Sequence, residues 1–193
     1  MSGLTAAPFW STLTEWLPPN DAIDRPQIQI ATVDETGAPD IRTVLLTSFD
    51  DEGFAFNTDA ASRKVAHLAA DPRIAIVILW PGFTWQLTIQ GAASPATHEQ
   101  WAAAYAKRSP YLKQLAWQNS LEFAQLPHEE RVARWTAFAA EHDLDEIGPS
   151  PTWAGFIVRP TRLTFWRSDP DTASQRTEYR LVDGVWERHL LAG

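Results

Sequence analysis

The sequence predicts a single, mainly β domain: a β-barrel with helices around it. Alternation of apolar and polar residues with a period of two begins at Gln27 and returns after Trp153, which is typical of half-buried strands. Between these regions the apolar residues have helical spacing. The 193 residues suffice for one sizeable core but not for two full domains. We therefore predict one domain over residues 1–193, with a helical insertion at approximately 97–142.

A short helix is expected before the first strand. Within residues 8–17, Phe9, Leu13 and Leu17 recur at about helical intervals, and Pro18-Pro19 ends the element. We expect this helix to lie across the barrel.

Five strands and one short helix are expected next. QIQIATVD and IRTVLLTSF form a hairpin around the turn residues ETGAPD, and FAFNT follows the turn DDEG. A helix is expected around residues 62–70, because Asp71-Pro72 disfavours its continuation. The apolar run RIAIVILW and the alternating segment TWQLTIQGAA, separated by Pro81-Gly82, complete the set.

The helical insertion carries its own start signals. Thr97 and Gln100 have the spacing of a capping box, and Ser109-Pro110 is typical of a helix N-cap followed by proline. Strand patterns then resume in four segments, WAGFIVRP, RLTFWR, RTEYRL and VWERHLL. Asp183-Gly184, between the last two, predicts a hairpin turn.

Composition excludes several classes of function. The formal net charge of −8 would repel a polyanion, so no nucleic-acid partner is expected. The chain has no Cys and its five His lack metal-like spacing, so we expect no metal site, and a reducing cytoplasm fits. The longest apolar run, residues 74–80, is too short to cross a bilayer, and the N-terminus lacks signal-peptide features. We expect a cytoplasmic protein with no membrane association.

Two cations stand where acidic side chains would be expected. Arg63 and Lys64 begin a helix, although a helix N-terminus carries partial positive charge and favours anions. If the preceding strand ends at Thr58, free backbone N–H groups, a hydroxyl and both cations converge, which predicts a phosphate site. Alternation can aim Arg42, one strand earlier, at the same end of the barrel. For an isolated SRK segment, exposed surface charges are the commoner interpretation.

The segment RTVLLTSFDDEGFAFNTDAASRKVAHLAADPRIAIVILWPG resembles the core of the pyridoxamine 5'-phosphate oxidase family. The resemblance extends from about Gln27 to the C-terminus and is strongest over residues 42–91. Further matching segments are QLTIQG, AKRSP, LAW and RPTRLTFWRSDPDTASQRTEYR. The resemblance implies an FMN-binding split β-barrel with peripheral helices, and a homodimer whose cofactor site lies between two subunits.

The resemblance also implies which residues contact FMN. Arg42, Thr58, Arg63 and Lys64 match residues around its phosphate, with Asn57 at the adjoining contact position, and Leu45 and Leu46 fall where backbone contacts approach the flavin. Gln86 matches a glutamine that hydrogen-bonds the ring system, and Trp166 and Arg176 match a cofactor-contacting Trp and Arg near the C-terminus. Taken alone, Gln86 would be an outward residue of an amphipathic strand and Trp166 a core aromatic.

The substrate side departs from the family pattern. The oxidase that makes pyridoxal phosphate has a Lys, an Arg, a His, a Tyr and a Ser at positions that carry here, in that order, Thr47, Thr172, Ser174, Ala104 and Leu112. Arg108 keeps its family identity, and Tyr105 can partly replace the lost Tyr. Each charge-assisted hydrogen bond is worth about 1.5–3 kcal/mol, so we predict inefficient turnover of pyridoxamine 5'-phosphate.

The leading hypothesis is an FMN-dependent oxidoreductase acting on an unidentified small molecule. In such a protein the flavin carries the hydride, so no catalytic side chain is assigned. One alternative is a non-catalytic FMN carrier or sensor. Another is a barrel that binds a different flat cofactor, such as haem or the cofactor of a deazaflavin-dependent reductase. An absorption spectrum distinguishes FMN, haem and a deazaflavin from one another.

Overall fold

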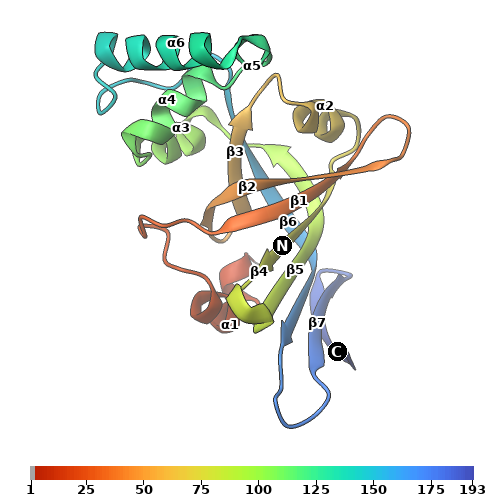
Figure 1. The fold of residues 1–193 in the computed structure, drawn as a ribbon. Helices are drawn as coiled ribbons and strands as arrows, with labels where there is room; N and C mark the ends of the chain where they lie inside the picture. Colours follow the sequence, from red (N-terminus) through yellow and green to blue (C-terminus); the bar gives the residue numbers. More distant parts are fainter. Residues whose placement is uncertain (1–2) are drawn as a thin grey trace.

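The predicted β-barrel is confirmed, and six antiparallel strands close it. The computed structural model describes residues 3–193 (Figure 1). The strands follow the order β3-β2-β1-β4-β5-β6, and pairing between β3 and β6 closes the ring. Their bounds are Gln27–Val33 for β1, Pro39–Phe49 for β2, Phe54–Asp59 for β3, Arg73–Leu79 for β4, Trp85–Pro95 for β5 and Trp153–Arg167 for β6.

Alternation along the strands builds the core. Ile28 and Ile30 of β1 are fully buried, as are Phe54 and Phe56 of β3. In antiparallel strands, residues directly opposite one another share a face of the sheet. A residue opposite Ile30 therefore also points into the barrel.

β6 is one strand, and the predicted division into WAGFIVRP and RLTFWR is wrong. Its pairing with β5 continues past Pro160 through a register shift between Gln90 and Gly91. Pro160 has no N–H to donate, and an irregularity of this kind is where a sheet tolerates proline. A Cβ on Gly91 would lie only 2.1 Å from the Arg159 carbonyl oxygen, so glycine allows the close approach. The resulting strand is 15 residues long.

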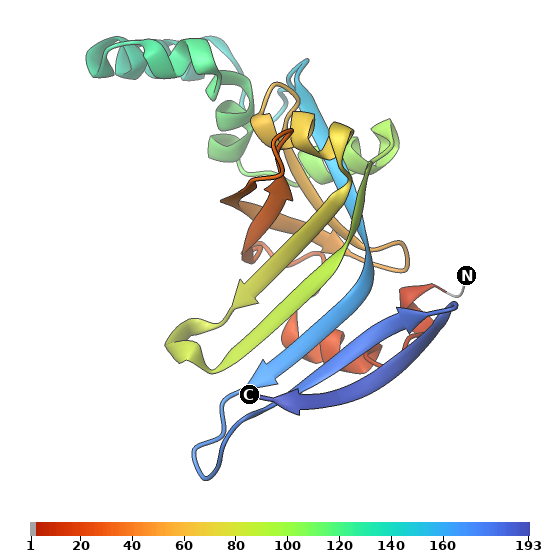
Figure 2. The ribbon, with the colours of Figure 1, turned by 90° about the vertical axis from the view of Figure 1, so that its right-hand side faces the viewer.

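A hairpin extends the sheet beyond the barrel. β7 (Gln175–Val182) pairs with the second half of β6, and β8 (Val185–Ala192) pairs with β7. Asp183 and Gly184 form the predicted turn, with φ of 49° and 83°. The N-terminal elements η1 (Leu4–Ala6) and α1 (Trp10–Trp16) lie at this end of the barrel (Figure 2). Phe9, just before α1, packs edge-on against Trp186 with ring centroids 4.7 Å apart.

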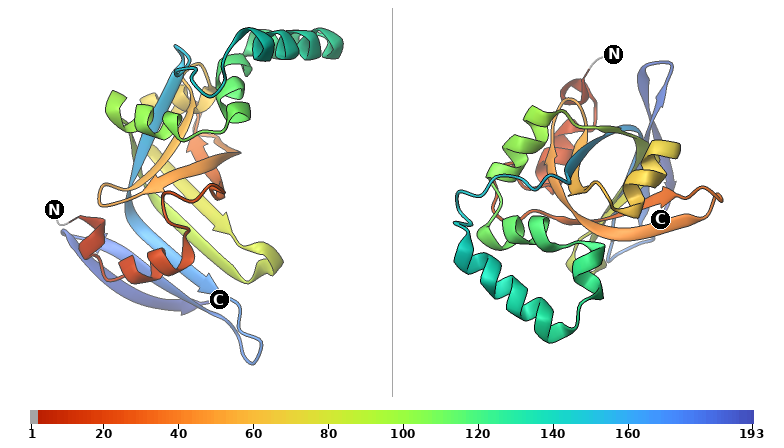
Figure 3. Two further views of the ribbon diagram at one scale, coloured as in Figure 1. Left: turned by 90° about the vertical axis from the view of Figure 1, so that its left-hand side faces the viewer. Right: turned by 90° about the horizontal axis from the view of Figure 1, so that it is seen from above.

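The other α-helices lie at the opposite end. α2 (Arg63–Ala70) connects β3 to β4, and the short turn η2 (Pro81–Phe83) connects β4 to β5. The predicted insertion contains α3 (His98–Ala106), α4 (Pro110–Gln118), α5 (Leu121–Gln125) and α6 (His128–Glu141). α3 begins with the predicted capping box, and α6 lies outermost (Figure 3). Within residues 3–193, no helix combines the length and the apolar character that crossing a membrane would need.

Candidate functional site

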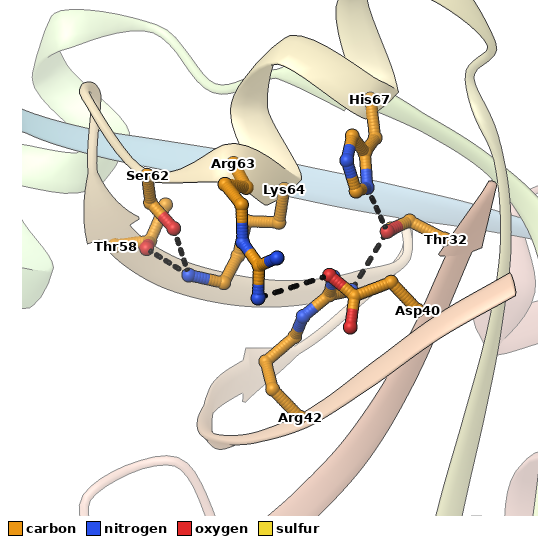
Figure 4. Close-up of polar contacts among 8 residues, drawn as sticks. All are labelled: Thr32, Asp40, Arg42, Thr58, Ser62, Arg63, Lys64 and His67. Carbon is orange, nitrogen blue, oxygen red and sulfur yellow. Dashed lines mark hydrogen bonds and ion pairs between the residues drawn. The ribbon is translucent and has the colours of Figure 1, made fainter. Parts of the chain in front are cut away.

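Lys64 connects the start of α2 to the end of β3. Ser62 precedes the helix in an extended conformation, but its side chain makes no capping hydrogen bond. Lys64 Nζ instead donates to the Ser62 hydroxyl and, at 2.9 Å, to Thr58 Oγ1 (Figure 4). The ammonium group is therefore fixed beside the helix N-terminus by two hydroxyls.

Arg42 reaches the same place from β2. It lies opposite the buried Ile30, so its side chain is on the inner face of the barrel. Its Nη1 donates to Thr32 Oγ1 at 2.7 Å, and its Nη2 donates to Asp40 Oδ2 at 2.6 Å. His67 Nδ1, from the other end of α2, lies 3.0 Å from the same Thr32 oxygen. Arg42 is thus held on both of its terminal nitrogens.

Three cations, one carboxylate, three hydroxyl side chains and one imidazole make up the phosphate-end cluster, which we define as Thr32, Asp40, Arg42, Thr58, Ser62, Arg63, Lys64 and His67. Arg63 is the exposed member: its side chain is 85% exposed, and its Nη2 lies 3.7 Å from Asp40 Oδ2. Burial, and after it the charge of Arg42, lowers the pKa of Lys64. Partial burial acts to raise the pKa of Asp40, but the hydrogen bond from Arg42 and its charge hold that pKa below the usual value.

The structure brings together four of the residues expected at the phosphate, namely Arg42, Thr58, Arg63 and Lys64 (Figure 4). Thr32, Asp40 and His67 were not anticipated. Two features of the sequence could have indicated Thr32 and Asp40. Thr32 continues the inward alternation of Ile28 and Ile30, and Asp40 lies two residues before Arg42 on the same face. The cluster presents guanidinium, ammonium and hydroxyl donors beside a helix N-terminus, which is the donor set that binds a phosphate group.

Asn57 faces away from this cluster. It neighbours Thr58 in β3, but its Oδ1 accepts a 2.9 Å hydrogen bond from Thr47 Oγ1. Both residues line a cavity of about 170 Å³ between α3 and the barrel, together with Trp101 and Ala104. Asp50 is the charged side chain among the cavity's lining residues. The lining of this cavity therefore offers neutral hydrogen-bonding groups, one carboxylate and an aromatic wall, and includes no cation.

The two flanking leucines differ in burial. Leu46 is fully buried in the core, so only its backbone can meet a ligand, as the family resemblance implies. Leu45 is half-buried and lies opposite Gln27 of β1.

Gln86, expected at the flavin ring, forms a row across neighbouring strands with Trp166 and Arg176, which were expected to contact the cofactor. Gln86 of β5 lies opposite Trp166 of β6, which lies opposite Arg176 of β7. Trp166 is largely buried, and its Nε1 donates to Ser174 Oγ at 2.8 Å.

Within one chain, this row is far from the phosphate-end cluster. Thr58 pairs with Ala154 at the start of β6, whereas Trp166 is near its end. Ala154 and Trp166 are 12 residues apart along β6, which corresponds to roughly 40 Å of extended chain.

Arg108 and Tyr105 are turned inward, between α3 and β6. The Arg108 guanidinium lies 4.5 Å from the centre of the Trp153 ring and donates to the Leu112 carbonyl oxygen through Nε at 3.3 Å and Nη2 at 3.1 Å. Tyr105 is 2% exposed, and its hydroxyl finds no hydrogen-bond partner among residues 3–193. Burial lowers the pKa of Arg108 and raises that of Tyr105.

Family models match most of the chain. Residues 20–143 match the model described as pyridoxamine 5'-phosphate oxidase, and residues 153–193 match the pyridoxine 5'-phosphate oxidase C-terminal dimerisation region. The pyridoxine/pyridoxamine 5'-phosphate oxidase of Anaeromyxobacter dehalogenans is 38% identical over 159 residues, covering 82% of this chain and 80% of the relative. The protein of the same name from Neisseria meningitidis is 34% identical, covering 86% and 78%.

Solved structures share the fold. PhzG from Burkholderia lata, crystallised with tetrahydrophenazine-1-carboxylic acid, superposes with a TM-score of 0.80 at 20% identity, covering 97% of this chain and 93% of that one. A pyridoxamine 5'-phosphate oxidase-related, FMN binding protein from Nostoc punctiforme gives 0.72 at 20% identity, covering 99% and 100%. The chain therefore belongs to the pyridoxamine 5'-phosphate oxidase family and has the split β-barrel fold of its FMN-binding members.

Proposed function

We propose that this protein is a homodimeric FMN-binding oxidoreductase whose substrate is a small molecule other than pyridoxamine 5'-phosphate. The observation that carries the proposal is the phosphate-end cluster. Arg42, Arg63 and Lys64 converge with the Thr58 hydroxyl at the start of α2, and these groups fit the phosphate of FMN.

Each cluster residue has a definable part in holding the cofactor. Lys64 and Thr58 would bind the phosphate from the β3 side, and Arg42 from the β2 side. Arg63, being exposed, can move onto the phosphate when it arrives. The bound flavin would accept or donate a hydride, while the protein orients it and excludes water.

The proposed site is shared between two subunits. Trp166 lies near the end of β6, and Gln86 and Arg176 lie opposite it on β5 and β7, whereas Thr58 pairs with the start of β6. Trp166 and Arg176 are within the segment that matches the family's dimerisation region. We therefore propose that these three residues contact the ring of the flavin whose phosphate the partner holds.

The geometry supports a substrate without a phosphate group. Thr47 and Ala104 line a cavity that offers no cation to a second phosphate. Arg108 already stacks on Trp153 and donates to the Leu112 carbonyl. A non-catalytic FMN carrier or sensor is the second candidate, favoured by this inward position of both Arg108 and Tyr105.

Spectroscopy of the purified protein tests the proposal. We expect a flavin absorption spectrum, or saturable binding of added FMN, that is lost in Arg63→Ala/Lys64→Ala. Lys107→Ala/Arg134→Ala removes the same charge elsewhere and should bind FMN normally. Absence of FMN binding by the wild type would refute the proposal and favour a deazaflavin or another cofactor.

Turnover measurements distinguish an FMN-dependent oxidoreductase from a non-catalytic FMN carrier. We expect NADH or NADPH to reduce the bound flavin and O2 or an organic acceptor to reoxidise it, with little peroxide produced from pyridoxamine 5'-phosphate. Bound flavin that no donor reduces would favour the carrier, and rapid peroxide production from that compound would contradict the substrate proposal.

A further inference from the structure

Asp40 places a carboxylate inside a cluster that is otherwise built to bind an anion. It lies opposite Thr32 in the β1–β2 pairing, and therefore on the same inward face as Arg42 two residues later. Its Oδ2 accepts from Arg42 Nη2 at 2.6 Å and lies 3.7 Å from Arg63 Nη2 (Figure 4). One carboxylate oxygen thus lies between two guanidinium groups. An oxygen of a bound anion would have its most favourable electrostatic energy at this position.

The neighbouring acid, Asp59, has hydrogen-bond partners outside the cluster. Asp59, at the end of β3, accepts from the Ala61 N–H at 2.7 Å through Oδ1 and from the Thr152 hydroxyl through Oδ2. Asp40 is therefore the member of the phosphate-end cluster whose negative charge faces the arginines.

Arg42 does not depend on Asp40 for its position. Its Nη1 donates to the hydroxyl of Thr32, which is 1% exposed and lies 3.0 Å from His67 Nδ1 on α2. These contacts through Thr32 link β1, β2 and α2 next to the Arg42 guanidinium. Loss of the Asp40 charge should therefore free Arg42 Nη2 and Arg63 without displacing Arg42.

We infer that Asp40 is an internal counter-anion that competes with the ligand's phosphate for Arg42 and Arg63 and so weakens the site's affinity for phosphate. The inference rests on the proposed function, in that FMN is the ligand. In the ligand-free protein the Asp40 carboxylate offsets the positive charge of the neighbouring cations. When FMN binds, its phosphate replaces Asp40 as the partner of Arg63 and binds Arg42 alongside Asp40. The cofactor would then exchange readily with free FMN.

The test compares FMN affinity, by quenching of flavin fluorescence at fixed ionic strength, in the wild type and in Asp40→Asn. Asparagine keeps the shape and a hydrogen-bond acceptor for Arg42 but removes the charge. Since a unit charge a few ångströms away acts strongly on a phosphate dianion, we expect about tenfold tighter binding. Riboflavin, which lacks the phosphate, should bind both proteins equally.

Asp71→Asn is the matched control. Asp71 forms the same type of pair with a residue two positions on, Arg73, but at the far end of α2. The control should leave FMN affinity unchanged. Unchanged or weaker FMN binding by Asp40→Asn, with normal binding by the wild type, would overturn the inference, as would an equal gain in Asp71→Asn.

Inorganic phosphate separates this inference from the proposed function. If the wild type binds no FMN, the proposed function fails, but thermal stabilisation by phosphate still reports on the cluster. We expect phosphate to raise the melting temperature of Asp40→Asn more than that of the wild type. An equal or smaller rise would overturn the role of Asp40 independently of FMN.

Discussion

At the scale of single residues, the candidate site depends on how a few polar groups share their hydrogen bonds. The cations themselves were visible in the sequence, because Arg63 and Lys64 stand at the start of a helix and match a family motif. Asp40 and Thr32 were not, because their roles depend on which residues of β1 and β2 lie opposite one another. Strand register is set by tertiary pairing and cannot be read from either segment alone.

Lys64 should make FMN affinity sensitive to alkaline pH. Its pKa is lowered from 10.5, mainly by burial, so its charge is lost at a lower pH than that of an exposed lysine. FMN affinity should therefore fall as pH rises through the lowered pKa. In Lys64→Arg, which stays charged, this decline should disappear from fluorescence titrations at pH 8–11. An identical decline in both proteins would exclude Lys64 as its source.

As pH rises, the stability of the ligand-free protein should increase, whereas FMN affinity should fall. Because the unfolded chain binds the Lys64 proton more tightly than the folded one, the Lys64 contribution to the free energy of unfolding rises with pH between the two pKa values. Denaturant titrations of the wild type against Lys64→Arg should show this rise. A contribution that falls over the same range would contradict the burial of the ammonium group.

At the scale of elements, sequence patterns located the barrel strands and the helix starts but not the continuity of β6. Thr97 with Gln100 and Ser109 with Pro110 begin helices as predicted, because capping is a local interaction. Pro160 suggested a strand end for an equally local reason. The pairing with β5 overrides it by a register shift next to Gly91, a long-range contact that the local pattern does not contain.

Gly91 should tolerate no side chain. In Gly91→Ala the added carbon would meet the Arg159 carbonyl oxygen at 2.1 Å and Pro160 Cα at 2.8 Å, both backbone atoms. We expect a loss of about 2–4 kcal/mol in the free energy of unfolding, measured by denaturant titration. Gly148→Ala is the control, because nothing lies within 4 Å of its added carbon. Equal stability of the two variants would refute the close approach of β5 and β6.

At the scale of the whole molecule, the two halves of the proposed cofactor site lie at opposite ends of β6. The phosphate-end cluster is beside the part that closes the barrel on β3, and the row of Gln86, Trp166 and Arg176 is beside the hairpin. A sequence contains no distances, so only the family resemblance could suggest a site between subunits. The separation of Thr58 and Trp166 along β6 is a physical argument in favour of this proposal.

Complementation between defective subunits tests the shared site. Arg63→Ala/Lys64→Ala removes the phosphate half, and Trp166→Ala/Arg176→Ala removes the ring half. Co-expression of the two variants should give heterodimers with one intact and one doubly defective site. With random pairing, roughly a quarter of the wild-type FMN capacity should return, measured by flavin absorbance per chain. If both halves came from one chain, co-expression would restore nothing.

The length of β6 has a consequence for how two flavins would bind to one dimer. If the two ends of this strand contact different cofactor molecules, as proposed, a change that a bound flavin causes at one end also affects the end that contacts the other. The two binding events are then linked, and linkage of this kind is reciprocal. The FMN isotherm of the dimer should depart from independent sites, with a Hill coefficient that differs from one.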